Sequence, residues 1–168
     1  MDTPPYWAFC WASGQVLAEY IIKHSYEFRD KTMLDIGCGS GVAGIAAKIV
    51  GVKKVISCDI DPMALNATKA NAKLNKVELE YLSDIACLES VVDLITAADI
   101  LYDRDNLSLL QTLPQLGRKV LVADSRIKNL ETQGYTLIDY RQTTTLPDLN
   151  EHPEFNEVKL YKQEHHQL

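Results

Sequence analysis

The sequence lacks long apolar runs, basic clusters and paired-cysteine motifs. No stretch approaches the roughly 18 apolar residues of a bilayer-spanning helix, so we expect no membrane span. Lysine and arginine are scattered and the net charge is −6, which disfavours a nucleic-acid partner, because such binding relies on a basic face. The four cysteines form no Cys-x-x-Cys pair, so we expect them to be reduced, in a reducing compartment. Residues 1–5 lack the features of a targeting signal, so we expect the protein to stay in the cytoplasm or to have had a presequence removed.

The four histidines do not have the spacing of a metal-binding motif, and no further ligand residues stand at suitable intervals from them. We therefore expect no metal site. What remains is the composition of a globular protein. The chain has 168 residues, of which 46% are hydrophobic and 24% charged, so it can bury a sizeable core but leaves little room for a second domain. We therefore predict a single domain over residues 1–168.

Short apolar runs alternate along the chain with stretches of helical periodicity. Five strands separated in this way are typical of an α/β fold with a doubly wound, Rossmann-like parallel sheet. The last two strands have little between them and indicate a hairpin at one edge. The expected strands are residues 33–36, 54–58, 77–82, 91–95, 119–123, 135–141 and 157–162, and the expected helices are residues 16–24, 41–50, 62–75 and 106–113.

A glycine-rich segment joins the first expected strand to the following helix, and reads Leu34-Asp35-Ile36-Gly37-Cys38-Gly39-Ser40-Gly41. Glycines let a backbone turn tightly and approach a ligand, and a helix N-terminus offers free N–H groups. Asp59 ends the second strand, where its carboxylate can accept bonds from both hydroxyl groups of a ribose. Since ligands of such sheets bind beyond the carboxyl ends of the strands, the sequence predicts a nucleoside site at this edge.

Two cofactors fit this segment. Residues 39–44, Gly-Ser-Gly-Val-Ala-Gly, match the dinucleotide fingerprint and with Asp59 would bind NAD. Asp35, however, precedes the first glycine by two residues, where a pyrophosphate has no use for a carboxylate. The ammonium group of S-adenosylmethionine can pair with a carboxylate at this position, so the two acids favour S-adenosylmethionine. NAD, or a plain strand–helix turn without a ligand, is the alternative.

The glycine segment, followed by Cys58-Asp59-Ile60-Asp61-Pro62, resembles the class I, seven-stranded S-adenosylmethionine-dependent methyltransferases. The resemblance extends over essentially the whole chain and implies the strand order 3-2-1-4-5-7-6, with strand 7 antiparallel. It also implies that Asp35 and the glycines hold the methionine part of the cofactor, Asp59 the ribose and Asp84 the adenine. The implied cofactor-binding residues are Trp7, Asp35, Gly37, Cys38, Gly39, Ser40, Gly41, Asp59, Ile60, Asp84 and Ala98.

The segment after the fourth strand is expected to meet the methyl acceptor. It reads Ala98-Asp99-Ile100-Leu101-Tyr102-Asp103 and lacks the Asn/Asp-Pro-Pro-Tyr of enzymes that methylate base amines or glutamine. It resembles instead the Asp-x-x-Tyr signature of protein-lysine methyltransferases. Together with residues 5–15, Pro-Tyr-Trp-Ala-Phe-Cys-Trp-Ala-Ser-Gly-Gln, it is similar to the electron-transfer flavoprotein β-subunit lysine methyltransferases.

This resemblance implies methyl transfer to lysine side chains of a protein, the β subunit of electron-transfer flavoprotein. Asp99 and Tyr102 are the implied catalytic residues, and Trp7 would line the methyl-donor pocket. Asp124 and Arg126 follow the fifth strand and are candidates for contact with the substrate. The alternatives are transfer to a ribosomal protein or a small-molecule amine, and an inactive cofactor-binding subunit.

Overall fold

The computed structural model describes residues 5–101, 104–127, 129–130 and 134–164. Seven strands form one sheet in the order β3-β2-β1-β4-β5-β7-β6. The first five are parallel, and β7 is antiparallel to both of its neighbours, which confirms the expected order and directions. The strands are β1 (Thr32–Ile36), β2 (Lys54–Cys58), β3 (Glu80–Leu82), β4 (Val92–Ala98), β5 (Gly117–Asp124), β6 (Thr136–Gln142) and β7 (Glu157–Glu164).

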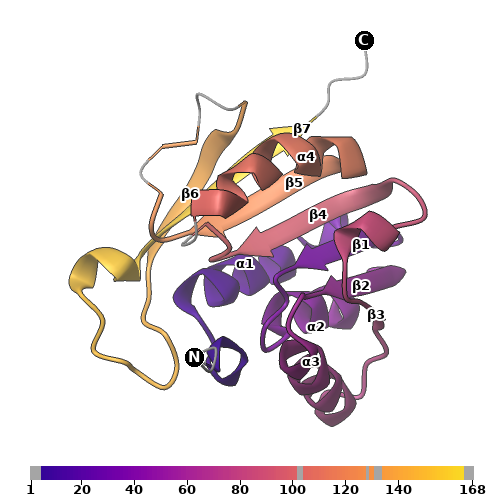
Figure 1. Cartoon of the computed structure of the whole chain (residues 1–168), viewed down its shortest axis with the longest axis horizontal. Helices are drawn as coiled ribbons and strands as arrows, with labels where there is room; N and C mark the ends of the chain where they lie inside the picture. The colour runs from indigo at the N-terminus through magenta and orange to yellow at the C-terminus, as the bar shows by residue number, and fades with distance from the viewer. Residues whose placement is uncertain (1–4, 102–103, 128, 131–133, 165–168) are drawn as a thin grey trace.

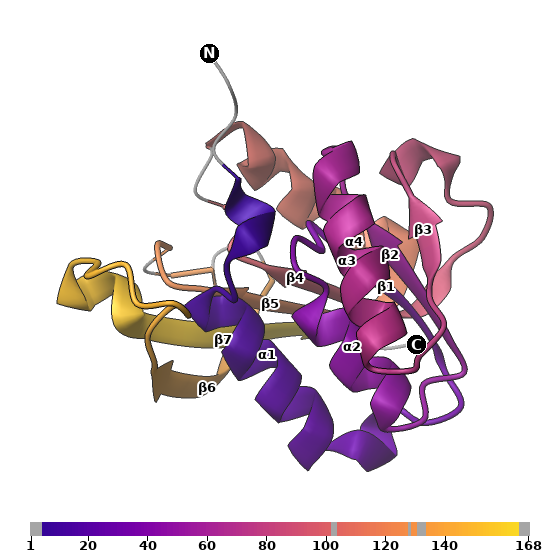
Figure 2. The same ribbon diagram turned by 90° about the horizontal axis from the view of Figure 1, so that it is seen from below.

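Helices cover both faces of the sheet (Figures 1 and 2). One face carries α1 (Ala12–Lys23), α2 (Val42–Ile49) and α3 (Pro62–Leu74), and the other carries α4 (Leu109–Leu116). None of the helices within the described residues has the length and apolar character of a bilayer span. The 3-10 helices are η1 (Tyr6–Ala8), η2 (Ser25–Glu27), η3 (Ile85–Cys87), η4 (Arg104–Ser108) and η6 (Pro153–Asn156).

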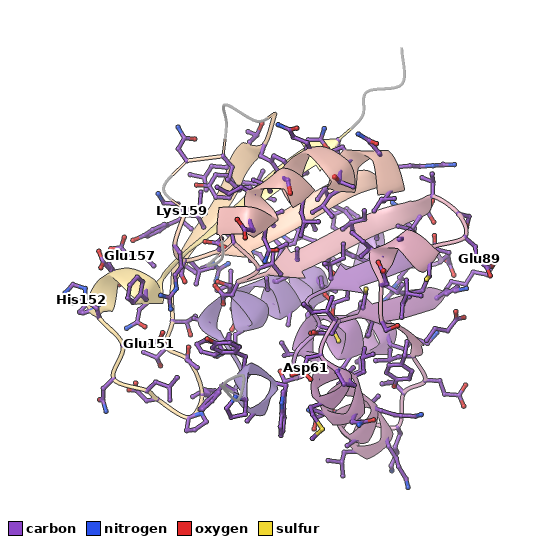
Figure 3. The ribbon with its side chains drawn as sticks, viewed as in Figure 1. Asp61, Glu89, Glu151, His152, Glu157 and Lys159 are labelled. Carbon is purple, nitrogen blue, oxygen red and sulfur yellow. The ribbon has the colours of Figure 1, made fainter. Side chains whose placement is uncertain are left out.

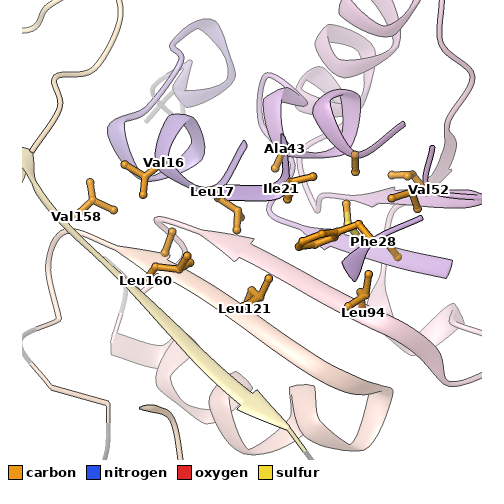
Figure 4. Close-up of a cluster of buried hydrophobic side chains, with 14 of the residues drawn as sticks. Val16, Leu17, Ile21, Phe28, Ala43, Val52, Leu94, Leu121, Val158 and Leu160 are labelled. Atoms are coloured by element: carbon orange, nitrogen blue, oxygen red, sulfur yellow. The ribbon is translucent and has the colours of Figure 1, made fainter. Parts of the chain in front are cut away.

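The core beneath α1 and α2 is built from apolar side chains that the helices and the central strands direct toward each other (Figure 4). Leu17 and Ile21 of α1 are fully buried, one turn apart on the same helix face. They pack in the same cluster as Leu94 of β4 and Leu121 of β5. Each such side chain contributes about 1.5–3 kcal/mol by leaving water, so this layer fixes α1 on the sheet.

The loops after α2 and α3 follow one pattern, in which a left-handed residue ends the helix. Gly51 has a φ of +100° after α2, which confirms the expected end of that helix. Lys76 has a φ of +57° after α3, and the Val77 N–H donates to Ala72 O over 3.0 Å. Val77 therefore belongs to the end of the helix, and the prediction that a strand begins there was wrong, because β3 begins only at Glu80.

The fourth helix also differs from its predicted bounds. It was expected over residues 106–113 with Pro114 closing it, but α4 begins at Leu109, after η4, and includes Pro114. Proline cannot donate to the carbonyl four residues earlier, which here is Leu110 O. The hydroxyl group of Tyr135 donates to Leu110 O over 3.0 Å instead. A tyrosine from a distant segment thus replaces the missing helical bond, and the helix continues through the proline.

Candidate functional site

The glycine segment forms the loop between β1 and α2, and two of its glycines are required by geometry. Gly37 has a φ of +64°, and a Cβ there would lie 2.6 Å from Ile100 Cγ2. Gly41 has a φ of +82°, and a Cβ there would lie 2.7 Å from Thr68 Cγ2. Both distances are far below van der Waals contact, so a side chain at either position would displace the loop. At Gly39 the corresponding position faces open space, with Gly37 O at 3.9 Å.

Two polar residues of α3, which sequence reasoning missed, fasten this loop. The Thr68 hydroxyl group donates to Gly39 O over 3.0 Å, and Asn71 Nδ2 donates to Ser40 O over 2.8 Å. Cys38 Sγ lies 3.3 Å from the same Thr68 hydroxyl group, and burial raises the pKa of this thiol, so it stays protonated. The signal in the sequence is the three-residue spacing of Thr68 and Asn71, which places both on one helix face.

Asp35 lies beneath the loop and is 3% exposed. Thr96 Oγ1 donates to Asp35 Oδ1 over 2.8 Å, and the Gly44 N–H donates to Asp35 Oδ2 over 3.2 Å. Asp35 thus ties the start of α2 to β4. Its contact with the methionine part of a cofactor stays a prediction. Desolvation raises the pKa of Asp35 to about 6 despite these hydrogen bonds.

This raised pKa makes the stability of the fold depend on pH. The Asp35 carboxyl group binds its proton more readily in the folded chain, so its contribution is fully present below its ordinary pKa of 3.8 and is lost as pH rises through about 6. Between about pH 4 and about pH 7 we expect the wild type to lose up to about 3 kcal/mol more free energy of unfolding than Asp35→Asn. Urea denaturation of both proteins across this range measures the difference, and parallel curves would contradict it.

Asp59 lies at the carboxyl end of β2, next to the loop. Its Oδ2 accepts the Gly39 N–H over 3.0 Å, and its Oδ1 accepts the Asp61 N–H over 3.0 Å. A carboxylate has about four acceptor positions, so each oxygen keeps one for a ribose hydroxyl group. The adjacent side chain of Ile60 is 90% exposed, an apolar surface that fits the face of a nucleobase. The loop, the carboxylate and Ile60 together fit an adenosine-bearing cofactor.

Three other predicted cofactor residues lie around this edge of the sheet. Asp84 is exposed and caps η3, since its Oδ1 accepts the Ala86 N–H over 2.8 Å. Trp7 is half-buried in η1, a segment that packs against α3. Ala98 ends β4 and pairs with Ala123 of β5. Direct contact of these residues with a cofactor stays a prediction, as it does for the loop residues.

Asp99 follows β4 and is held by two segments distant in sequence. The Ser13 hydroxyl group donates to Asp99 Oδ1 over 2.5 Å, and the Ser13 N–H donates to Asp99 Oδ2 over 3.3 Å. The Ser125 hydroxyl group donates to Asp99 Oδ1 over 3.2 Å. Desolvation, opposed by these donors, raises the pKa of Asp99 to about 6. Tyr102, the second predicted catalytic residue, lies outside the described residues.

The long connection between β6 and β7 borders the Asp99 end of the sheet. Arg126, just after Ser125, places its guanidinium carbon 3.9 Å from the Phe155 ring centroid, and its Nη2 lies 3.1 Å from Glu151 Oε1. Glu151 is on this connection (Figure 3). Asp124 is fully buried, and its Oδ1 accepts the Arg126 N–H over 2.7 Å. Arg126 and Asp124 therefore fix this connection and the end of β5, and contact with the substrate stays a prediction for both.

The N-terminal segment joins the same connection. Cys10 and Leu146 exchange two backbone hydrogen bonds of 2.9 Å. Gln15 Nε2 donates to both Cys10 O and Thr144 O, over 2.9 Å and 2.8 Å. Trp11 donates through Nε1 to Tyr6 O over 2.7 Å. The segment before α1 is thus joined to the segment after β6.

Known proteins resemble the chain over most of its length. Electron-transfer flavoprotein β-subunit lysine methyltransferase from Mus musculus is 33% identical over 157 residues, or 86% of this chain and 60% of the relative. The protein of the same description from Danio rerio is 39% identical over 128 residues, or 71% of this chain and 50% of the relative. These matches confirm the resemblance expected from the motifs, and the chain spans about 50–60% of the length of these relatives.

A crystal structure described as ribosomal protein L11 methylase, from Lactobacillus delbrueckii subsp. bulgaricus, has the same fold. It superposes with a TM-score of 0.69 at 22% identity and covers 91% of this chain and 79% of its own. Residues 19–112 match the family model described as ribosomal protein L11 methyltransferase (PrmA), and this range is more than half of the 168 residues. The chain therefore belongs to the ribosomal protein L11 methyltransferase (PrmA) family and has the class I methyltransferase fold.

Proposed function

We propose that residues 1–168 act as one domain that transfers methyl groups from S-adenosylmethionine to lysine side chains of a protein. One observation carries this proposal. Gly37 of the cofactor loop is so close to Ile100 that a Cβ would lie 2.6 Å from its side chain, and Ile100 is the neighbour of Asp99. The Asp99 carboxylate, which would bind the lysine, is therefore next to the cofactor loop, as methyl transfer between two bound groups requires.

The loop of residues 37–41 would hold the methionine part of the cofactor, Asp59 the ribose and Ile60 the adenine. When bound, S-adenosylmethionine supplies a methyl group that its sulfonium makes electrophilic. The residues favour this cofactor over NAD, because the named relatives are methyltransferases and because the carboxylates of Asp35 and Asp99 border the loop. Carboxylates near the loop disfavour the negative charge of a pyrophosphate.

The chain contributes binding and alignment of the lysine. Free lysine has a pKa near 10.4, so only about one in two thousand side chains is neutral at pH 7. Asp99 receives the incoming ammonium group through its acceptor position on Oδ2 and orients the nitrogen toward the cofactor loop. A nearby carboxylate raises the pKa of a lysine, so Asp99 serves binding and alignment, and the proton of the ammonium group passes to water.

We propose the β subunit of electron-transfer flavoprotein as the acceptor, because the two named curated relatives carry its name. A ribosomal protein is the second candidate, which the family model favours. The four cysteines are free and two are buried, so we propose the reducing environment of the cytoplasm as the location.

Tritiated S-adenosylmethionine, added with the purified chain to a cell extract, tests the proposed function. We expect one main labelled protein, and we expect mass spectrometry to identify it as the β subunit of electron-transfer flavoprotein with methylated lysine. A labelled ribosomal protein would select the second candidate. Label confined to small molecules, or no label above an extract without the chain, would contradict protein methylation.

A further inference from the structure

We infer that Ser13 and Ser125 are positioning residues that hold the Asp99 carboxylate in the orientation that receives the lysine. Both hydroxyl groups donate to the same oxygen, Asp99 Oδ1, over 2.5 Å and 3.2 Å. Hydrogen bonds to a charged group are stronger than neutral ones, so two of them fix the plane of the carboxylate. The inference rests on the proposed methyl transfer, in which Asp99 binds the ammonium group.

The distribution of donors decides which oxygen meets the substrate. Of the about four acceptor positions of a carboxylate, Oδ1 uses two for the serine hydroxyl groups. Oδ2 receives the Ser13 N–H over 3.3 Å, a longer bond, and keeps its second position. The ammonium group of lysine therefore bonds Oδ2, and the two serines set the direction of that bond.

The two serines reach Asp99 from different elements of the fold. Ser13 lies in the first turn of α1 and is fully buried, while Ser125 directly follows β5. The backbone of Asp99 has a φ of +49° and its N–H donates to Ala123 O over 3.0 Å. A left-handed backbone is uncommon outside glycine, and here contacts from α1 and β5 together maintain it.

The same serines keep Asp99 ionised. Desolvation raises the pKa of Asp99, and so does the charge of Asp124 at the end of β5, whereas the bonds from Ser13 and Ser125 lower it. Arg126 acts on this group indirectly, because its charge lowers the pKa of Asp124. Removing one serine hydroxyl group therefore moves the pKa of Asp99 upward, toward neutral pH.

The variants Ser13→Ala and Ser125→Ala test this inference. An NMR titration of the Asp99 carboxyl carbon in the free chain should show its midpoint raised by about one pH unit in each variant. With the β subunit of electron-transfer flavoprotein as acceptor, the acid limb of the pH profile of kcat should move by the same amount. We also expect kcat to fall by about ten-fold where Asp99 is fully ionised, with KM for S-adenosylmethionine unchanged.

Two controls accompany these variants. Ser57 is fully buried, and its hydroxyl oxygen has no hydrogen-bond partner among the described residues, so Ser57→Ala should leave the Asp99 midpoint in place. Asp124→Asn removes the neighbouring charge and should lower the midpoint. If Ser13→Ala does not fold, Ser125→Ala alone carries the test, because it lies outside the helices.

An Asp99 midpoint that stays in place in the folded serine variants, or an equal movement in Ser57→Ala, would overturn the inference. Failure of the proposed function gives a different result. In that case the Asp99 midpoint would move in both serine variants, but neither the wild type nor any variant would transfer a methyl group to lysine at any pH.

Discussion

Replacing Asp99 with asparagine is expected to lower kcat for methyl transfer by about 100-fold, while the affinity for S-adenosylhomocysteine stays near that of the wild type. The loss corresponds to about 1.5–3 kcal/mol for a hydrogen bond to a charged group. Asparagine keeps the size of the side chain, and its carbonyl oxygen can still accept the Ser13 N–H, so the start of α1 remains capped. Steady-state kinetics and titration calorimetry separate the two quantities.

Asp93→Asn is the matched control, because Asp93 lies near the opposite end of the same strand and accepts bonds from Thr32. This variant loses a carboxylate from β4 far from the loop, and we expect its kcat to equal that of the wild type. Full activity of Asp99→Asn would remove Asp99 from the chemistry and leave it a cap of α1. An equal loss in both variants would indicate a general effect on the fold.

Replacing Asp59 with alanine is expected to weaken the binding of S-adenosylhomocysteine by about 100-fold or more. The variant loses the acceptor of both ribose hydroxyl groups, each bond being worth about 1.5–3 kcal/mol with a charged acceptor. It also frees the Gly39 N–H, which Asp59 Oδ2 accepts over 3.0 Å, so the loop loses one of its supports. Titration calorimetry measures the dissociation constant directly.

Asp61→Ala separates binding from folding in the same segment. Asp61 Oδ1 accepts the Met63 N–H over 2.8 Å and caps α3, so its loss should cost about 1 kcal/mol of stability. The affinity for S-adenosylhomocysteine should change by less than about two-fold, since this carboxylate is engaged with the helix end. Unchanged affinity in Asp59→Ala, or equal weakening in both variants, would exclude Asp59 as the ribose acceptor.

The alternation of strands and helices is a local feature of the sequence, and it predicted a parallel sheet with a hairpin at one edge. The order of the strands came from the family resemblance that the glycine loop and Asp59 carry, and the structure has that order. The position of Asp59 beside the glycine loop could also be predicted, because the carboxyl ends of neighbouring parallel strands meet at one edge of the sheet. Its contact with a ribose stays a prediction. The end of α2 at Gly51 could be predicted as well, since a residue of positive φ often ends a helix and glycine adopts this conformation most readily.

The hydrogen bonds that hold the site residues in place could not be predicted from the sequence, because they join residues far apart in the chain. Ser13 and Asp99 are 86 residues apart, and Thr68 reaches the loop from a different helix. Asp35 accepts a hydrogen bond from Thr96 of the neighbouring strand, and the place of Thr96 beside it follows only from the folded sheet. Likewise, Pro114 predicts the end of a helix from the sequence. The helix α4 continues through it because the Tyr135 hydroxyl group donates to Leu110 O, and that contact is seen only in the folded chain.

A crystal structure of the chain with S-adenosylhomocysteine tests the central claim most directly. We expect both ribose hydroxyl groups within hydrogen-bonding distance of the Asp59 carboxylate, the adenine against Ile60, and the sulfur atom facing Asp99. A ribose turned away from Asp59, or a sulfur atom on the side of the loop remote from Asp99, would contradict the proposed methyl transfer to lysine.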